Sequence, residues 1–426
     1  MATQFTEKEN PNWKRPFFTI WFGQVFSLLG SQIVQFAVIW YLTKETGSAT
    51  VLATATLVAM LPPVLLGPFI GSLVDRGNRR CIIILADAGI AAATIVLAAL
   101  FALGIVEVWH IYLLLILRAL GGAFHSPAFG ASTSLMVPTE QLTRLQGINQ
   151  TVHGGLNIIS APLGAVFLEF MTMQTILAID VVTAAVAITT VLFVAIPQPE
   201  RKKRESDGKE NTYWEDFREG FTYVLSWRGL LIVMLMATAI NFLLVPASAL
   251  TPLLVSDYFG GGPIELGWFE AIFSGGVIGG GILLGVWGGF KRRIATVMFG
   301  LIGLGTGMAI VGWVSPDGFN LALAGMLLAG IMAPITNGSL GAIFQASVDP
   351  AMQGRVFTLI GSLASGMAPI GLIFAGPLAD RVGIQAWYLV GGVVCALMGL
   401  WGFSNRNLMA IEEGRGRPAA EEVLTE

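Results

Sequence analysis

Apolar residues occur along this chain in twelve long runs, and each run is separated from the next by a short segment with charge, glycine or proline. Every run is long enough to cross about 30 Å of hydrocarbon as an α-helix. The pattern predicts an all-α polytopic membrane protein with twelve transmembrane helices at about residues 17–43, 49–74, 81–104, 109–136, 144–171, 174–196, 229–256, 264–289, 294–314, 319–346, 353–379 and 385–404. The first run is too long for a signal-peptide core, so we expect it to be retained as a helix.

The longest polar stretch, Pro197 to Arg228, divides these helices into two sets of six and contains the basic run RKKR. Its second part has apolar residues at helical spacing, which predicts an amphipathic helix on the inner membrane face; they are Trp214, Phe217, Phe221 and Val224. As a charge run, this stretch is better explained as a solvated, lipid-facing connector than as a binding site. We expect four parts: a six-helix bundle at 1–196, a cytoplasmic linker at 197–228, a second six-helix bundle at 229–405 and a cytoplasmic tail at 406–426.

Composition and charge agree with a membrane protein. Hydrophobic residues make up 54% of the chain and charged residues 12%, about half the charged share of a soluble domain. If both termini are cytoplasmic, all 24 lysine and arginine residues except Lys44, Arg118 and Arg381 lie on the cytoplasmic side, as the positive-inside rule requires. The net charge of -3 gives no indication of a nucleic-acid partner. The two cysteines, Cys81 and Cys395, exclude a disulfide framework and offer no metal cluster.

The stretch GSLVDRGNRR lies between the second and third expected helices. Gly71 permits close helix contact, Gly77 with Asn78 permits a tight turn, and the arginines hold the loop on the cytoplasmic side. An ordinary positive-inside loop would leave Asp75 unexplained, whereas an acid beside three bases at a helix end can hold a neighbouring helix in one of two positions. The candidate gating residues are Gly71, Asp75, Arg76, Arg79 and Arg80.

The two halves of the chain contain related segments. GVWGGFKRR, which begins at Gly285, lies 214 positions after Gly71 (285 minus 71), and it keeps the bases but lacks the acid. VPTEQLTRLQG with Arg144 corresponds to VDPAMQGRVFT with Arg355, at an offset of 211. An internal repeat of this kind predicts two parallel bundles around a central cavity.

Four ionisable side chains fall within the expected spans, where a charge costs at least ~2.5 kcal/mol and usually faces a cavity or a partner. Arg118 and Asp180 lie roughly 13 Å and 9 Å below the outer ends of their helices, depths compatible with an ion pair. Asp87 lies roughly 9 Å from the inner end of its helix, so it could pair with Arg118 only if the arginine side chain reached inward. Glu270 has no base nearby in sequence and is the more titratable acid. These four charges either take part in proton coupling or only hold helices together.

Polar residues follow one face of three helices. They are Gln24, Ser27, Ser31 and Gln35 in the first helix, Asn149, His153, Asn157 and Ser160 in the fifth, and Thr238, Asn241 and Ser248 in the seventh. Such stripes either line a water-filled cavity or make interhelical hydrogen bonds. His125 and His153 are candidate proton carriers, although a lone helical histidine is more often simply hydrogen-bonded. Phe129 is one of several aromatic residues that could contact an apolar substrate.

The glycine run from Ser274 to Gly285 superficially resembles a phosphate-binding loop. It lies within an expected span and lacks the G-K-S/T ending of such loops, whereas its four-residue glycine spacing predicts close helix packing; the pairs are Gly276 with Gly280 and Gly281 with Gly285. With no nucleotide-binding segment, no HExxH and no constellation at catalytic spacing, we expect neither a cofactor nor an enzyme.

The loop GSLVDRGNRR also resembles the signature loop of the major facilitator superfamily, G-x-L-x-D-R-x-G-R-R/K; the matching residues are Gly71, Leu73, Asp75, Arg76, Arg79 and Arg80, and Asn78 stands where the pattern has glycine. Within that superfamily the chain is similar, over essentially its whole length, to the macrolide-efflux type of drug:proton antiporter. The similar segments include RALGGAFHSPAFGASTSLMVP, LAIDVVTAAVAI and GRVFTLIGSLASGMAPIGLIFAGPLADRVG. The antiporter signature G-P-x-x-G-G is only partly kept, as APLGA from Ala161 to Ala165.

The resemblance implies a monomeric secondary transporter of the cell membrane that exports a bulky lipophilic compound, such as a macrolide, in exchange for protons. Arg118 resembles the arginine of the family's fourth-helix motif, to which a part in proton transfer is ascribed. Because helices one, four, seven and ten surround the substrate in this family, the expected cavity residues are Gln24, Ser31, Gln35, Phe129, Thr238 and Asn241. The alternatives are export of another amphiphile, such as a siderophore or lipid, and a non-transporting membrane sensor or scaffold, which would leave the buried charges without a task.

Overall fold

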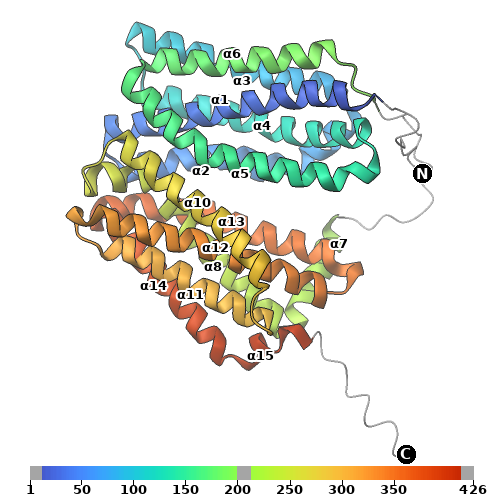
Figure 1. The fold of residues 1–426 in the computed structure, drawn as a ribbon, viewed down its shortest axis with the longest axis vertical. Coiled ribbons are helices and arrows are strands. Elements are labelled where there is room, and N and C mark those ends of the chain that lie inside the picture. The colour runs from blue at the N-terminus through green and yellow to red at the C-terminus, as the bar shows by residue number, and fades with distance from the viewer. Residues whose placement is uncertain (1–11, 199–212, 414–426) are drawn as a thin grey trace, which may run out of the picture. The chain divides into compact units, whose positions relative to one another are not determined.

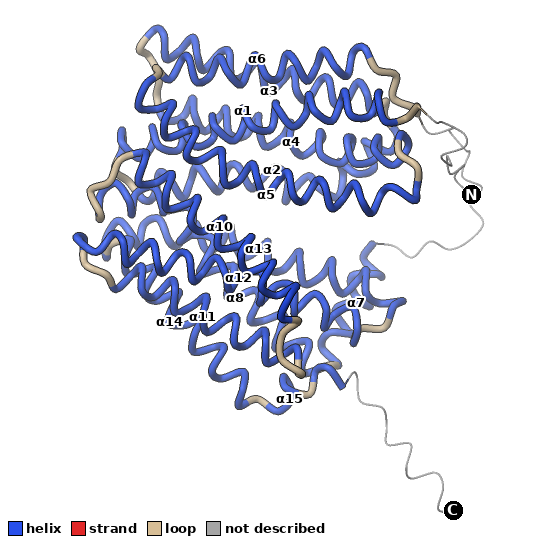
Figure 2. Tube along the Cα trace, viewed as in Figure 1, coloured by secondary structure: helices blue, strands red, loops and turns tan. Residues whose placement is uncertain are grey.

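The computed structural model describes residues 12–198 and 213–413, and all regular secondary structure in these residues is helical (Figures 1 and 2). Twelve of the helices are long and apolar enough to cross a membrane, which confirms the expected fold class. Those of the first half are α1 (Lys14–Thr46), α2 (Ala49–Arg76), α3 (Arg79–Leu103), α4 (Val108–Met136), α5 (Thr139–Phe170) and α6 (Met173–Phe193). Those of the second half are α8 (Arg228–Ala249), α10 (Pro263–Trp287), α11 (Arg293–Trp313), α12 (Phe319–Ser347), α13 (Pro350–Val382) and α14 (Ile384–Ser404).

Local sequence explains where the helices end. α1 stops at Gly47, whose φ of 56° favours glycine, and Ser48 then caps α2 by accepting a hydrogen bond from the Val51 amide. The helix expected at 229–256 is interrupted, because α8 ends at Ala249 and is followed by the short α9 (Thr251–Leu253) and a π-helical segment (Leu254–Tyr258). Pro252 has no amide hydrogen and cannot continue the α8 ladder, so a single helix was the wrong prediction there.

The described residues form two compact units. The first unit contains α1 to α6 and residues Gly261–Ala271 at the start of α10, whereas we expected only residues 1–196. Within it α1 packs on α5 and α6, α3 packs on α4 and α6, and α2 packs on α4 (Figure 1). Because successive helices alternate in direction, Arg76, Arg79, Arg80 and Arg144 all lie at the end of this unit where α1 begins.

The second unit contains the remaining described helices, in which α11 packs on α12 and α14, and α8 packs on α13 and α14. The expected amphipathic helix is present as α7 (Tyr213–Ser226), although Val224 is buried in this unit's core rather than facing lipid. The short α15 (Arg406–Met409) also packs on α8 and buries Leu408, so the expected tail begins as part of the unit.

The glycine run of α10 packs as predicted at two of its four positions. A Cβ on Gly276 would lie 3.0 Å from the Gly330 Cα, and one on Gly280 would lie 2.8 Å from the Ile331 Cα, so these two glycines let α10 approach α12 closely. The prediction was wrong for Gly281 and Gly285, which have no neighbour within 4 Å because they face away from α12.

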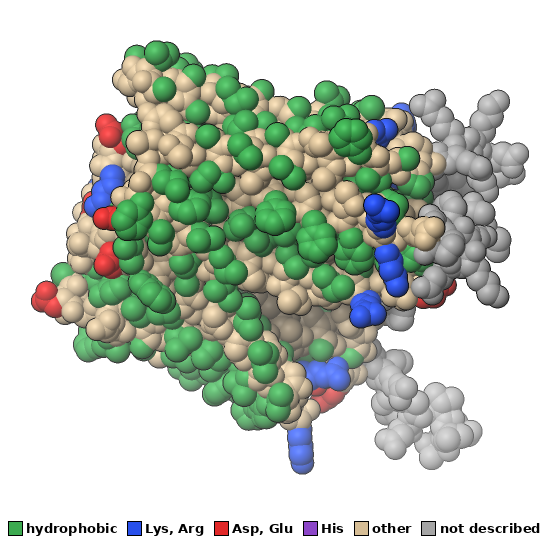
Figure 3. Space-filling model, turned by 45° about the horizontal axis from the view of Figure 1, so that its top comes forward, with side chains coloured by type: hydrophobic (Ala, Val, Ile, Leu, Met, Phe, Trp, Pro, Cys, Tyr) green, Lys and Arg blue, Asp and Glu red, His purple; other side chains and the backbone are tan. Residues whose placement is uncertain are grey.

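The surface agrees with insertion in a bilayer. Hydrophobic side chains cover the helix flanks, whereas lysine and arginine side chains gather toward one end of the helices (Figure 3). Many large apolar side chains on these flanks are strongly exposed, among them Leu85, Phe193 and Trp313 at 71%, 86% and 76%. Exposure of this extent would be costly in water and is expected in contact with lipid.

Candidate functional site

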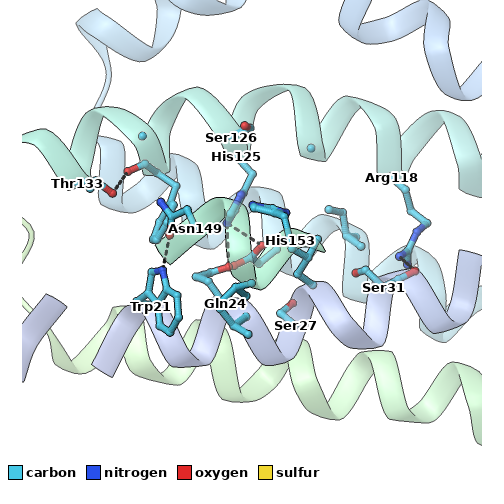
Figure 4. A pocket seen from close by; sticks show the side chains of 18 of the residues that line it. Trp21, Gln24, Ser27, Ser31, Arg118, His125, Ser126, Thr133, Asn149 and His153 are labelled. Carbon is cyan, nitrogen blue, oxygen red and sulfur yellow. Dashed lines mark hydrogen bonds and ion pairs between the residues drawn. The ribbon is translucent and has the colours of Figure 1, made fainter. Parts of the chain in front are cut away.

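The first unit contains a cavity of about 480 Å³ bounded by α1, α3, α4 and α5 (Figure 4). Its size is that of a small-molecule pocket, and its lining combines apolar and aromatic groups with several polar ones. The polar and charged lining residues are Gln24, Ser27, Ser31, Asp87, Arg118, His125, Ser126, Thr133, Gln146, Asn149 and His153. Within a bundle of mainly apolar helices, these residues make this the candidate site.

Arg118 and Asp180 form the ion pair that helix depth indicated. Arg118 Nη1 lies 2.5 Å from Asp180 Oδ2, and the aspartate side chain is only 1% exposed. Asp180 also accepts hydrogen bonds from the hydroxyls of Ser31 and Thr94, at 2.9 Å and 3.2 Å. Arg118 Nη2 donates to the Ser31 carbonyl at 3.2 Å. The buried pair therefore links α1, α3, α4 and α6.

A glycine explains why α1 can take part in this contact. A Cβ on Gly30 would lie 3.3 Å from the Asp180 Cα, so α1 and α6 approach closely at this level. That approach places the Ser31 hydroxyl within hydrogen-bond distance of the Asp180 carboxylate.

Asp87 has a different set of partners from the one expected. Its Oδ2 accepts a hydrogen bond from Gln24 Nε2 at 3.0 Å, and its Oδ1 lies 3.5 Å from His125 Nε2. His125 Nε2 is also 3.0 Å from Gln24 Oε1 (Figure 4). Arg118 does not reach inward to Asp87, because its guanidinium is already held by Asp180, Thr94 and Ser31.

A close approach of α3 and α4 brings Asp87 and His125 together. A Cβ on Gly121 would lie 2.7 Å from Ile90 Cγ1 and 3.4 Å from the Ala86 carbonyl oxygen. A larger residue at this position, one helical turn before His125, would have to displace the Ile90 side chain. Only Arg118, a full charge, was expected as a partner of Asp87, so this cluster was not predicted, although Gln24 belongs to the polar face of the first helix and His125 is a candidate proton carrier.

The α5 wall of the cavity is held by hydrogen bonds to α1. Trp21 Nε1 donates to Asn149 Oδ1 at 2.7 Å, and Gln32 Nε2 donates to Asn157 Oδ1 at 3.3 Å. His153 lines the cavity and is exposed there. The polar stripes of α1 and α5 therefore do both things that the sequence left open, since they line a cavity and join helices.

Three of the expected substrate residues lie together in the first unit. Gln24, Ser31 and Phe129 line the cavity of the first unit. Gln35 is exposed and does not line it, because it lies one helical turn beyond Ser31, past the end of the cavity. Thr238 and Asn241 belong to α8 in the second unit, where their side chains donate to the Met234 and Ala237 carbonyls of the same helix at 2.7 Å and 2.9 Å.

Glu270 belongs to the part of α10 that groups with the first unit, and its side chain is partly buried. Among the residues described in that unit, no hydrogen-bond or ion-pair partner is found for its carboxyl group. The neighbouring Phe269 is fully buried. Glu270 thus differs from Asp87 and Asp180, whose carboxylates both have polar partners.

The loop between α2 and α3 uses its arginines to bind helix ends. Arg79 Nη1 donates to the Ala131 carbonyl of α4 at 2.9 Å, and Arg80 donates to the Val191 and Leu192 carbonyls of α6. The Val191 and Leu192 carbonyls lie in the last turn of α6, where partners within the helix run out, whereas Ala131 lies five residues before the end of α4. Arg76 is exposed.

Other features of that loop differ from the expectation. A Cβ on Gly71 would have no neighbour within 4 Å, so this glycine does not serve close packing in this conformation. The φ of Gly77, -86°, does not favour glycine, and a Cβ there would lie 2.7 Å from Ile82 Cδ1, at the end of a side chain that can move. Asn78 caps α3. The side chain of Asp75 lies outside the described residues.

Comparison with known proteins places the chain among transporters. Residues 20–372 and 244–418 match the family model described as Major Facilitator Superfamily. The chain is 38% identical over 391 residues to macrolide efflux protein A of Streptococcus pyogenes, which covers 91% of this chain and 96% of that protein. It is 36% identical to macrolide efflux protein A of Enterococcus faecalis over 326 residues, 76% of this chain and 100% of that protein. It is 28% identical to the multidrug efflux pump Tap of Mycolicibacterium fortuitum over 411 residues, 91% of this chain and 95% of the pump.

Solved structures share the fold. The nucleoside transporter NupG gives a TM-score of 0.66 at 13% identity, covering 94% of this chain and 99% of that one. A bacterial homologue of the human lysosomal transporter Spinster, in an inward-facing and unoccupied conformation, gives a TM-score of 0.66 at 15% identity, covering 96% and 100%. At such identities these structures bear on architecture alone.

Proposed function

We propose that this chain, which belongs to the Major Facilitator Superfamily, exports a bulky lipophilic drug by proton antiport with alternating access, and that the drug is a macrolide antibiotic. The observation that carries the proposal is the polar cavity inside the first unit, which Asp87, Arg118 and two histidines line in a bundle of apolar helices, with Arg118 paired to the buried Asp180. Such charges are costly in a membrane and are retained where ions or substrates pass. The names of the relatives at 36% and 38% identity support the drug class.

The coupling residues of the proposal are Arg118, Asp180, Glu270 and Asp87. Arginine keeps its proton under all physiological conditions, so a proton that reaches Asp180 must displace Arg118 from it. Breaking that pair would release four helices from one another, which is the kind of two-state event that alternating access needs. Glu270, without a polar partner in its own unit, is free to exchange a proton without breaking an existing contact.

The proposed orientation places both termini in the cytoplasm of a multi-pass protein of the cell membrane. The basic residues of the first unit gather where α1 begins, and the positive-inside rule makes this end cytoplasmic. In this orientation the loop with Asp75, Arg79 and Arg80 is the cytoplasmic gate, and the arginine contacts to α4 and α6 hold one of its states. The transporter acts as a monomer in this proposal.

The test is uptake of radiolabelled erythromycin into inverted membrane vesicles that contain the protein, with an imposed pH gradient and then with a protonophore. Accumulation that depends on the gradient, collapses with the protonophore and is lost in Asp75→Asn supports proton-driven export through a gated cycle. Correctly inserted protein that accumulates no macrolide would refute this substrate, and export of another amphiphile would become the leading explanation.

Glu270→Gln tests the coupling acid. The variant inserts normally and loses gradient-driven accumulation if Glu270 carries the proton, because glutamine keeps the shape of the side chain but cannot bind a proton. Accumulation with an unchanged dependence on pH would remove Glu270 from the proposal.

A further inference from the structure

A second polar cluster lines the cavity about two helical turns from the Arg118–Asp180 pair. It consists of Gln24 on α1, Asp87 on α3 and His125 on α4, each within 3.0–3.5 Å of the other two (Figure 4). Asp87 is buried, and the His125 side chain is 21% exposed toward the cavity. The cluster therefore joins a buried carboxylate to a histidine that a ligand in the cavity can reach.

The hydrogen-bond pattern of the cluster determines which histidine nitrogen can gain a proton. An ionised carboxylate only accepts hydrogen bonds, so the Gln24 amide must point its nitrogen toward Asp87 and its oxygen toward His125. The amide oxygen is also only an acceptor, so His125 Nε2 must carry a hydrogen in either charge state. The nitrogen that gains or loses a proton is therefore Nδ1.

The charges around the cavity do not cancel while His125 is neutral. α1 contributes no charged group, α6 contributes Asp180, and α4 contributes Arg118, which neutralises Asp180. α3 contributes Asp87, and α5 contributes His153 on the opposite wall, without a partner among the described residues. One negative charge, that of Asp87, remains. An uncompensated charge in low dielectric is costly, and a further cation in the cavity, such as a proton on His125, would compensate it.

Two aromatic rings beside the cluster suit a cation. The ring of Phe129 stacks on that of His125, with centroids 5.9 Å apart and planes inclined by 13°, and Trp21 also lines the cavity. Aromatic faces attract cations with about 0.5–2 kcal/mol, most strongly where water is excluded. The same faces can stabilise a protonated imidazole or an ammonium group of a ligand.

We propose that His125 and Asp87 form an exchange site at which a proton on His125 Nδ1 and the cationic group of a lipophilic amine compensate the same carboxylate in turn. When the ammonium group binds beside Asp87, the proton leaves Nδ1 for water; when the ammonium group leaves, a proton from water returns to Nδ1. The charge of the cavity is then the same in both states. This proposal rests on the proposed function and narrows its substrate to amphiphiles that carry one positive charge.

The first test measures proton release by the unmodified protein. Tetraphenylphosphonium is a lipophilic cation with no exchangeable proton, so any proton released when it binds comes from the protein. We expect isothermal titration calorimetry of the purified protein, in two buffers of different ionisation heat, to show release of up to one proton per bound cation. Release should vanish at a pH high enough that His125 is already neutral before the cation binds. Binding without proton release at any pH would overturn the proposal.

Variants assign the site. In His125→Gln, proton release should disappear and the affinity for tetraphenylphosphonium should no longer depend on pH. In unmodified protein, that affinity should fall by up to about tenfold for each unit by which the pH is lowered, because a proton on His125 competes with the cation. His110→Gln is the matched control, because His110 sits at the outer end of α4, where its Nδ1 accepts from the Glu107 amide, and should behave as unmodified protein. Loss of proton release in His153→Gln, with release kept in His125→Gln, would place the proton on α5 and refute the assignment.

Asp87→Asn tests the ammonium side of the exchange. This variant should lose at least about tenfold in affinity for erythromycin, which carries a tertiary amine, because one charged contact in a buried site is worth 1.4 kcal/mol or more. Its affinity for the N-demethyl-N-acetyl derivative, which has the same lactone ring without the charge, should be unchanged. Equal losses for both compounds would mean that Asp87 acts only on the fold.

The outcomes separate this proposal from the proposed function. Proton release with tetraphenylphosphonium, together with no transport of erythromycin, would support the exchange site and refute macrolide export. Proton-driven macrolide export without proton release by tetraphenylphosphonium would support export and refute the exchange site. If His125→Gln does not purify as a monodisperse protein, the measurement on unmodified protein decides alone.

Discussion

Replacing Asp180 by asparagine should cost the protein much of its stability, because it leaves a charge buried without its partner. The guanidinium of Arg118 would keep only uncharged acceptors, among them the Thr94 hydroxyl and the Ser31 carbonyl. The two charged side chains are 10% and 1% exposed, so water has little access to the place of the lost carboxylate. Removing one partner of a buried ion pair costs about 3–5 kcal/mol. At about 2–4 °C per kcal/mol for a unit of this size, Tm should fall by roughly 6–20 °C.

The assay is thermal unfolding of the purified protein in detergent, followed by tryptophan fluorescence. The double variant Arg118→Met, Asp180→Val is the informative comparison, because removing both charges relieves the desolvation penalty and should recover most of the lost Tm. If Asp180→Asn and the double variant melt at the same temperature, or if neither differs from unmodified protein, an unpaired buried charge does not cause the loss of stability. Either result would refute the reasoning. Transport by the double variant then separates two roles, since a stable variant that does not transport requires the pair for more than packing.

Two further predictions compare a contact with a neighbouring control. Gly280→Ala should lower the free energy of unfolding by about 1–3 kcal/mol, and Tm with it, because its Cβ would overpack against the Ile331 backbone. Gly281→Ala has open space around its Cβ and should leave Tm unchanged or slightly higher, and equal effects of the two variants in thermal unfolding would argue against close packing of α10 on α12. Arg80→Gln should increase deuterium uptake at the end of α6, measured by mass spectrometry, because two carbonyls there lose their hydrogen-bond donor. Arg76→Gln should leave the uptake unchanged, since Arg76 is exposed. An equal rise in both variants would mean that the lower positive charge of the loop, not the Arg80 contacts, causes the change.

The helices could be predicted from the sequence because length and hydropathy alone decide whether a segment spans a bilayer. The predicted helix boundaries are wrong where something other than length and hydropathy determines them. α5 begins at Thr139 instead of residue 144, since its first turns are polar yet helical, and the seventh expected helix breaks at Pro252, where an apolar run hides a missing amide hydrogen.

The candidate site was only partly predictable. The depth of a residue along a helix follows from about 1.5 Å per residue, which is why Arg118 and Asp180 could be paired. The partners of Asp87 depend instead on how α3 and α4 are rotated toward each other, and the close packing at Gly121 is one contact that favours the observed rotation. No pattern within one helix contains this information. Gln35 shows the converse error, since it continues the correct face of α1 but lies beyond the cavity.

The position of the α1 stripe suggests how the two clusters of the first unit act together. Gln24 and Ser31 are seven residues apart, two turns on one face, and each binds a different cluster: Gln24 contacts Asp87 and His125, and Ser31 contacts Asp180 and Arg118. α1 is therefore tethered to α3, α4 and α6 at two levels. A ligand or proton that changes the contacts of Gln24 loosens the first tether, and a proton on Asp180 loosens the second, so α1 can move at each level separately. A rigid helix with two exchangeable attachments converts a change of charge at either level into a movement of the cavity wall, which suits coupling of proton and substrate.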